Sequence, residues 1–130
     1  MTTEKEELEL QVSPSRWSRR WSDPNDVIKA HVNLVIEESK TVRDSVPADL
    51  GIRYSDKLPK ATLDVYGTDL PESSPIFVYV SGGYWQELSA DVSAYPVTPM
   101  HQNGVVTVIM GYDRAPGGSI LTYTILFRAC

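Results

Sequence analysis

The chain has 130 residues, of which 42% are hydrophobic, and this is enough for one domain with a buried core. Its formal net charge of −5 opposes non-specific binding to nucleic acid, which requires Lys and Arg to neutralise phosphates. No apolar run approaches the ~20 residues of a membrane-spanning helix, and the N-terminus lacks the basic and apolar regions of a signal peptide. Since the single cysteine, Cys130, cannot form an internal disulfide, a cytoplasmic location is expected.

Residues 1–22 are predicted to form an N-terminal arm. The first eleven residues are rich in glutamate and are expected to form a frayed, solvated helix. Trp17 and Trp21 then lie among three arginines close to a proline. We expect the arginines to stack on the tryptophan rings or to pair with carboxylates, and the arm to pack on the core of the domain.

A long helix is predicted to begin at Pro24, because Asp23 can cap its free N–H groups and proline suits the first helical position. A mostly apolar stripe continues to about Val46, and Pro47 ends the helix. The stripe consists of Val27, His31, Leu34, Val35, Glu38 and Val42. His31 is interpreted as a core or boundary residue, since no cysteine, histidine or carboxylate has metal-ligand spacing to it.

After Pro47 the pattern changes from helix to strand. Strands are predicted at residues 52–54, 61–66, 76–80 and 105–110. The last two are apolar on both faces, as expected of central strands that are covered on each side. Residues 88–102 between them are predicted to hold a crossover helix, which Pro96 and Pro99 either begin or shorten. The expected fold class is α/β, with a mostly parallel sheet, an N-terminal helix and a crossover helix.

The strand at 76–80 continues directly into Ser81–Trp85, which contains two adjacent glycines. Glycines permit backbone conformations that are closed to other residues, and they leave space for a ligand. Backbone N–H groups in such a turn can form an oxyanion hole, in which one donor contributes roughly a hundred- to thousandfold in rate. A tight turn without a ligand is the alternative. A phosphate-binding loop is disfavoured, because no Gly-Lys-Ser/Thr follows.

Four segments together resemble kynurenine formamidase, also called arylformamidase, and the resemblance covers about residues 12–119. These segments are Ser13–Trp17, Leu63–Tyr66, Phe77–Gln86 and Gly111–Pro116. The resemblance implies an α/β-hydrolase fold that hydrolyses N-formyl-L-kynurenine to L-kynurenine and formate, in tryptophan catabolism, through a Ser-Asp-His triad without a metal or another cofactor. It also implies that the backbone amides of Gly83 and Tyr84 are the oxyanion-hole donors. Trp85 would line the pocket for the aryl formamide.

The sequence departs from this family in two places. The motif Ser81, Gly82, Gly83, Tyr84, Trp85 has serine where the family pattern, His-Gly-Gly-x-Trp, has histidine. More seriously, no Gly-x-Ser-x-Gly occurs. The chain therefore offers no candidates for the nucleophilic serine and the aspartate and histidine that follow it in α/β-hydrolases.

The remaining acid and base side chains are not expected to be catalytic. His31 and His101 match no triad position. No spacing pairs the aspartates that were considered as acid or base groups, and solvated or capping roles are expected for them. These aspartates are Asp64, Asp91 and Asp113.

Residues 23–119 are therefore interpreted as a partial α/β-hydrolase domain, the N-terminal part of the fold, and residues 120–130 as an atypical C-terminal tail. We interpret the chain as a truncated product that is inactive alone and has exposed apolar strand edges. The alternative is a non-catalytic interaction or regulatory fragment that binds a partner through its unfinished sheet. A second copy of the chain or a full-length enzyme is the expected partner, and nucleic acid and membranes are not.

Overall fold

The computed structural model describes residues 3–119, so the predicted tail and Cys130 lie outside the described residues. The chain divides into two compact units, Met1–Leu34 and Val35–Cys130. The division falls within the long helix α2, Pro24–Ser45. No helix in the described part of the chain combines the length and the apolar composition that crossing a membrane requires.

The first unit begins with α1, Glu4–Gln11, which a capping box stabilises at its N-terminus. The amide of Glu6 donates to the hydroxyl of Thr3, and the amide of Thr3 donates to the carboxylate of Glu6. The Thr3 amide, and to a lesser extent the Thr3 hydroxyl, holds the pKa of the Glu6 carboxyl below its usual value. The predicted glutamate-rich helix is therefore present, with a defined start.

The tryptophan segment follows as a 3₁₀ turn, Pro14–Trp17. The Trp17 indole donates to the carbonyl of Leu10 at 3.0 Å. The guanidinium of Arg20 lies 5.4 Å from the centre of the Trp21 ring, which confirms the predicted stacking for this arginine.

The boundaries of α2 agree with the sequence pattern. Pro24 is its first residue, and the helix ends at Ser45, two residues before Pro47. The carboxylate of Asp23 accepts a hydrogen bond from the amide of Asn25 at 2.8 Å, so it satisfies one of the free N–H groups at the helix start.

The buried face of α2 differs from the predicted stripe. In the second unit, Ser39 is buried together with Val35 and Val42, whereas Glu38 is exposed. The stripe was predicted from apolar residues, so a serine was overlooked. Ser39 can be buried because its hydroxyl accepts a hydrogen bond from the buried amide of Ala94 at 3.0 Å.

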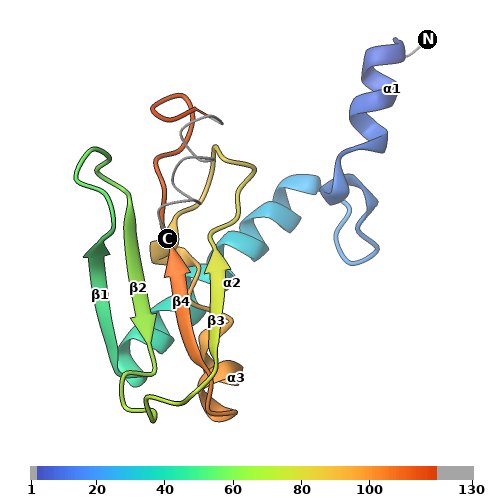
Figure 1. Ribbon diagram of the computed structural model, residues 1–130. Coiled ribbons are helices and arrows are strands. Elements are labelled where there is room, and N and C mark those ends of the chain that lie inside the picture. The colour runs from blue at the N-terminus through green and yellow to red at the C-terminus, as the bar shows by residue number, and fades with distance from the viewer. Residues whose placement is uncertain (1–2, 120–130) are drawn as a thin grey trace. The chain divides into compact units, whose positions relative to one another are not determined.

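A four-stranded mixed sheet forms the centre of the second unit (Figure 1). Its strands, in chain order, are β1 (Ala48–Arg53), β2 (Thr62–Tyr66), β3 (Ile76–Val80) and β4 (Val106–Met110). In space the order is β1-β2-β4-β3. β2 is antiparallel to both β1 and β4, and only β3 and β4 are parallel.

The prediction of a mostly parallel sheet is therefore wrong. The connections at 54–61 and 67–75 are each shorter than the dozen or more residues that a parallel crossover needs. β2 consequently runs opposite to β1, and the chain reverses again to enter β3. The prediction of a parallel pair joined by a crossover is confirmed for β3 and β4.

The crossover contains a 3₁₀ turn, Ala90–Val92, and the short helix α3, Val97–Gln102. Pro96 immediately precedes α3, and Pro99 lies in its first turn. Both prolines are therefore at positions where the missing N–H costs no helical hydrogen bond. This agrees with the prediction that they begin or shorten the helix.

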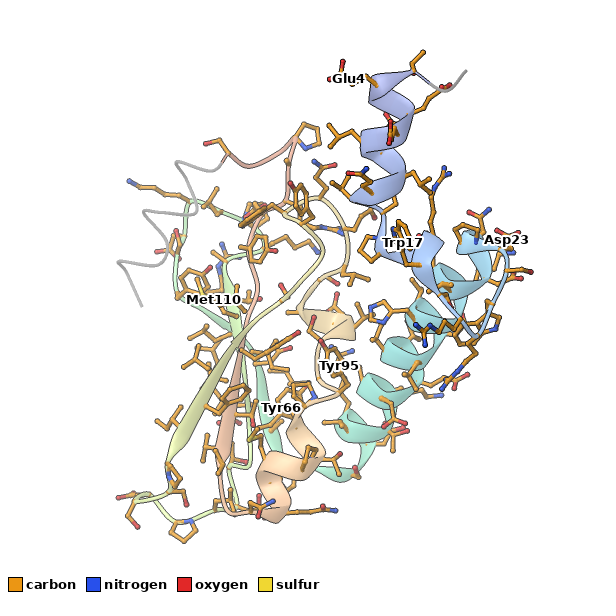
Figure 2. All side chains as sticks on the ribbon, turned by 90° about the vertical axis from the view of Figure 1, so that its right-hand side faces the viewer. Glu4, Trp17, Asp23, Tyr66, Tyr95 and Met110 are labelled. Atoms are coloured by element: carbon orange, nitrogen blue, oxygen red, sulfur yellow. The ribbon has the colours of Figure 1, made fainter. Side chains whose placement is uncertain are left out.

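One face of the sheet packs on helices. Figure 2 shows Tyr66 and Tyr95 on the side of the sheet that the C-terminal half of α2 and α3 cover. The core on this side is formed by Val42, Val46, Tyr66, Ala90, Ala94, Val97 and Ile109. We call it the helix face. Over residues 35–119 no helix covers the opposite face, which we call the open face.

β3 is not the covered central strand that its apolar composition suggested. Among residues 3–119 it lies at the edge of the sheet, and its exposure alternates along the strand. Ile76, Val78 and Val80 on the open face are 65%, 58% and 37% exposed. The apolar run correctly predicted a strand, but its place in the sheet and the segments that pack on its faces depend on other parts of the chain.

The hydroxyls of Tyr66, Tyr79 and Tyr95 lie on the helix face. The Tyr79 hydroxyl is hydrogen-bonded to that of Tyr95, and burial together with this bond raises the pKa of Tyr79 to about 12. Burial also raises the pKa of Tyr66, although the nearby Arg43 partly offsets the effect. Among the described residues, the buried Tyr66 hydroxyl has no partner in hydrogen-bonding geometry. The helix face therefore contains polar hydroxyl groups within its apolar core.

Candidate functional site

The glycine turn lies at the carboxyl end of β3, and its geometry requires glycine at one position. Gly83 has a φ of +115°, and a Cβ there would lie 1.9 Å from the carbonyl oxygen of Glu87. The carbonyl of Gly83 accepts hydrogen bonds from the amides of Gln86 and Glu87 at 3.0 and 2.9 Å, which close the turn. A Cβ on Gly82 would meet nothing within 4 Å. Only Gly83 is therefore demanded by both conformation and space.

The backbone of this segment is strained at three residues that are not glycine. Tyr84, Trp85 and Leu88 have φ values of 54°, 62° and 57°. The left-handed region costs an L-residue about 1–3 kcal/mol and persists only where the surrounding structure enforces it. Such strain concentrates at active sites and ligand-binding loops, so the clustering favours a functional turn over a simple connection.

The amides of Gly83 and Tyr84 have no acceptor among the described residues. Within residues 3–119, neither donates a hydrogen bond to the backbone or to a side chain. A hollow of about 410 Å³ adjoins the turn, lined by Val80, Ser81, Gly82, Tyr84, Trp85 and Tyr112. None of these lining side chains carries a formal charge at neutral pH, so the hollow suits an uncharged aryl group.

Contacts from the segment after β4 hold the turn in place. The hydroxyl of Tyr112, which is buried, donates to the carbonyl of Ser81 at 2.8 Å. The amide of Ala115 donates to the carbonyl of Trp85 at 2.8 Å. The sequence did not identify Tyr112 as a site residue. Its only indication was its place in Gly111–Pro116, one of the segments that carry the family resemblance.

Ser81 belongs to the end of the sheet rather than to the exposed turn. It is 4% exposed, and its amide donates to the carbonyl of Met110 at 3.3 Å, which extends the β3–β4 ladder by one residue. Its backbone is therefore fixed from both sides, by Met110 and by Tyr112. These contacts use only the backbone of Ser81, so they do not depend on its side chain.

Two of the aspartates considered from the sequence have structural partners. Asp64 is buried, and its carboxylate accepts a hydrogen bond from the amide of Gly51 at 2.8 Å. Asp113 accepts one from the amide of Lys60 at 3.1 Å. The first contact joins β2 to β1, and the second joins the segment after β4 to the loop before β2, as expected for structural rather than catalytic carboxylates.

The other candidate acid and base groups lie apart from the turn or have their own partners. Asp91 lies 3.6 Å from the guanidinium of Arg43. His101 Nε2 is 3.0 and 3.1 Å from the two carboxylate oxygens of Asp69. His31, in the first unit, is exposed, so its interpretation as a core or boundary residue is wrong. Across residues 3–119, no three His, Cys, Asp or Glu side chains gather in a way that could hold a metal ion.

Curated kynurenine formamidases are similar to this chain, although no family model matches it. The enzyme of Danio rerio is 42% identical over 120 residues, which cover 89% of this chain and 39% of that protein. The enzyme of Salmo salar is 41% identical over 117 residues, with the same coverage, and that of Drosophila melanogaster is 28% identical over 117 residues. The chain thus spans about two-fifths of the length of these relatives.

A solved structure shares the fold. The crystal structure of a candidate thioesterase from Silicibacter sp. TM1040 matches with a TM-score of 0.67 over 78% of this chain and 38% of that one. Only 21% of the residues are identical, so the likeness concerns the fold alone. Both comparisons therefore match this chain to part of a larger protein.

Proposed function

We propose that this chain forms the oxyanion-hole part of a hydrolase of the kynurenine formamidase type, with the fold of the N-terminal part of an α/β-hydrolase. The reaction is the hydrolysis of N-formyl-L-kynurenine to L-kynurenine and formate. The observation that carries the proposal is the pair of unused amides, Gly83 and Tyr84, in a strained turn at the carboxyl end of β3. The 42% identity to a kynurenine formamidase supports the same reaction.

In the proposed mechanism, a serine attacks the formyl carbon and negative charge develops on the formyl oxygen. The N–H groups of Gly83 and Tyr84 donate to this oxygen, and they stabilise the transition state because they are fixed before the charge appears. The rings of Trp85 and Tyr112 border the adjoining hollow, where the aryl group of the substrate would lie. A histidine accepts the serine proton, and an aspartate orients that histidine.

The serine, histidine and aspartate of this mechanism are not provided by the sequence described above. It contains no Gly-x-Ser-x-Gly, the turn that presents the nucleophile in α/β-hydrolases. We therefore expect turnover to require residues beyond these 130. The isolated oxyanion hole would leave only a weak residual rate.

A chimera tests the proposal directly. Residues 12–119 replace the matching segment of the Danio rerio kynurenine formamidase, and hydrolysis of N-formyl-L-kynurenine is measured for the chimera and for the 130-residue chain. We expect turnover by the chimera and none above background by the chain alone. A folded chimera without activity, or a chain that is active alone, would contradict the proposal.

Two variants of the chimera locate the donors. Gly83→Ala should lower kcat by about 100-fold or more, because the turn that carries both amides cannot keep its geometry. Gly82→Ala is the matched control and should retain most of the activity, since its Cβ meets open space. Equal activity of the two variants would argue against the assigned donors.

A non-catalytic interaction or regulatory role is the second candidate, and the exposed edge strand β3 favours it. In this case the chain would bind a full-length enzyme and change its activity without turnover of its own. Titration of the Danio rerio enzyme with the chain distinguishes the two functions. No binding and no change in rate at micromolar concentration would count against this role.

A further inference from the structure

The glycine turn is bonded at both of its ends to the segment that follows β4, Gly111–Ala115. At the start of the turn, the Tyr112 hydroxyl donates to the carbonyl of Ser81 at 2.8 Å. At the far end, the amide of Ala115 donates to the carbonyl of Trp85 at 2.8 Å. The first bond comes from a side chain and the second from the backbone, so a substitution can remove the first without changing the course of the chain.

The segment after β4 is itself fixed to β2 and to the residues before it. The amide of Gly111 donates to the carbonyl of Thr62 at 2.8 Å, and the carbonyl of Gly111 accepts from the Tyr54 hydroxyl at 2.7 Å. The carboxylate of Asp113 accepts from the amide of Lys60 at 3.1 Å. The backbone on both sides of the intervening tyrosine is thus anchored.

The side chain of Tyr112 is also confined by packing. Tyr112 is 9% exposed and belongs to a buried cluster with Ala61 and Met110. Side chains in such clusters are close-packed, so the position of the ring fixes the position of its hydroxyl. A hydrogen bond in a site with little water is also electrostatically stronger than one in solvent. Tyr112 therefore presents a fixed donor to the carbonyl of Ser81.

That carbonyl lies directly before the peptide that carries the first proposed oxyanion donor. The carbonyl of Ser81 and the amide of Gly82 form one rigid peptide plane, and the Tyr112 hydroxyl fixes its orientation. The next peptide carries the amide of Gly83, and its direction follows from the dihedral angles of Gly82. Since a glycine restricts these angles only weakly, the fixed plane before it limits where the donors can point.

The turn needs such support, because its conformation is unfavourable in itself. Tyr84, Trp85 and Leu88 have positive φ values, and residues other than glycine keep such values only where surrounding contacts enforce them. Tyr112 and Ala115 supply contacts of this kind from outside the turn. Loss of the tyrosine hydroxyl should therefore let the turn adopt other conformations.

We propose that Tyr112 is a positioning residue of the oxyanion hole, whose hydroxyl acts through Ser81 to direct the amides of Gly83 and Tyr84 at the reacting formyl oxygen. The inference rests on the proposed hydrolase function and adds to it a residue that supports the donors. Loss of the hydroxyl should weaken binding of the transition state and not of the substrate, because phenylalanine keeps the ring that borders the hollow.

Steady-state kinetics of the chimera with the Danio rerio enzyme test this role. Tyr112→Phe should lower kcat about ten- to a hundredfold and leave KM within about twofold of the parent chimera. Tyr54→Phe is the matched control, because its hydroxyl also donates to a carbonyl, that of Gly111, and Gly111 keeps its bond to Thr62. The control should retain kcat within about twofold. An unchanged kcat in Tyr112→Phe, or an equal loss in both variants, would overturn the proposal.

Nuclear magnetic resonance of the full 130-residue chain tests the positioning without any turnover. In Tyr112→Phe the amide signals of Gly83 and Tyr84 should shift and broaden, because the turn would exchange between conformations. In Tyr54→Phe the same signals should keep their positions and widths, and the dispersion of the other signals verifies that each variant is folded. The proposal does not survive turn signals that are unchanged in Tyr112→Phe.

The two experiments separate this inference from the proposed function. A parent chimera without activity would contradict the hydrolase function, and the amide signals of the chain would then decide alone whether Tyr112 positions the turn. An active parent chimera whose kcat is the same in Tyr112→Phe would overturn the positioning role and leave the hydrolase function in place.

Discussion

At the level of single residues, the backbone nearby decides which side chain a position can hold. Gly83 is restricted by its φ and by the carbonyl of Glu87, while Gly82, its neighbour, is not restricted. Ser39 is restricted in another way, since its hydroxyl is the partner of a buried amide. In both cases a backbone group determines which residue fits: the Glu87 carbonyl excludes a Cβ at position 83, and the Ala94 amide needs the hydroxyl at position 39.

Gly83→Ala in the isolated chain should lower the free energy of unfolding by about 1–3 kcal/mol, because an added Cβ would overlap the carbonyl of Glu87 and disfavour the observed φ. Urea unfolding followed by circular dichroism measures the change. Gly82→Ala is the control and should differ from the wild type by less than about 0.5 kcal/mol. Similar losses in both variants would show that the turn is not held as described.

Ser39→Ala should lower the free energy of unfolding by about 1–3 kcal/mol, because the buried amide of Ala94 would lose its acceptor. Ser45→Ala, near the exposed end of the same helix, removes only local bonds to the carbonyls of Thr41 and Val42 and should cost less than about 0.5 kcal/mol. The same unfolding experiment compares the two. An equal cost would mean that Ser39 contributes no more than an ordinary helix position.

At the level of elements, one side-chain pair ties the loop after β2 to α3. The loop after β2 carries Asp69, and its carboxylate accepts hydrogen bonds from Nε2 of His101 near the end of α3. An ionised carboxylate can only accept, so Nε2 carries the hydrogen. This bond lowers the pKa of Asp69 from its usual value of 3.8.

The stabilising effect of the Asp69–His101 pair should therefore depend on pH. Since the pKa of Asp69 is lower in the folded than in the unfolded chain, its contribution is fully present above about pH 4 and is lost as the pH falls through the folded pKa. Asp69→Asn should thus be less stable than the wild type near neutral pH, and the difference should shrink in more acid solution. Urea unfolding over this pH range measures it.

Glu72→Gln, on the same loop, is the control for a general effect of removing negative charge. Its stability difference from the wild type should not follow the acid-dependent course expected for Asp69→Asn. A difference between Asp69→Asn and the wild type that stays constant with pH would show that the pair with His101 does not perturb this carboxyl group.

At the level of the whole second unit, the two faces of the sheet have different environments. The helix face contains fully buried residues such as Ile109, which is 0% exposed, whereas Ile76 on the open face is 65% exposed. Both are isoleucines in strands that pair with each other. Such an asymmetry is expected when the segments that would cover one face of a sheet lie outside the residues described. It agrees with the coverage of the curated relatives, of which this chain spans about 39%.

Ile109→Thr should lower the free energy of unfolding by about 2–4 kcal/mol, because it removes buried apolar contacts and places a hydroxyl in the core. Ile76→Thr replaces an exposed side chain by another strand former and should cost less than about 0.5 kcal/mol. Measurements at low micromolar concentration keep association between copies from adding to either value. Equal costs would show that the open face is buried in solution.

Much of the local structure was predictable from neighbouring residues. Pro24 and Asp23 marked the start of α2, and the run Ile76–Val80 coincided with β3. The turn with Gly83 was recognised from its two glycines and its family resemblance. Ser39 and Tyr112 were not recognised as important, because their roles depend on partners far away in the chain.

The sequence by itself determined the helix boundaries, the positions of most strands and the place of the glycine turn, because capping, proline geometry and side-chain alternation act over a few neighbouring residues. Only the tertiary structure decided that β2 runs antiparallel to its neighbours, that β3 lies at an edge, and that one face of the sheet is open. These features depend on which distant segments pair and pack. An apolar strand has the same local pattern whether one face or both are covered.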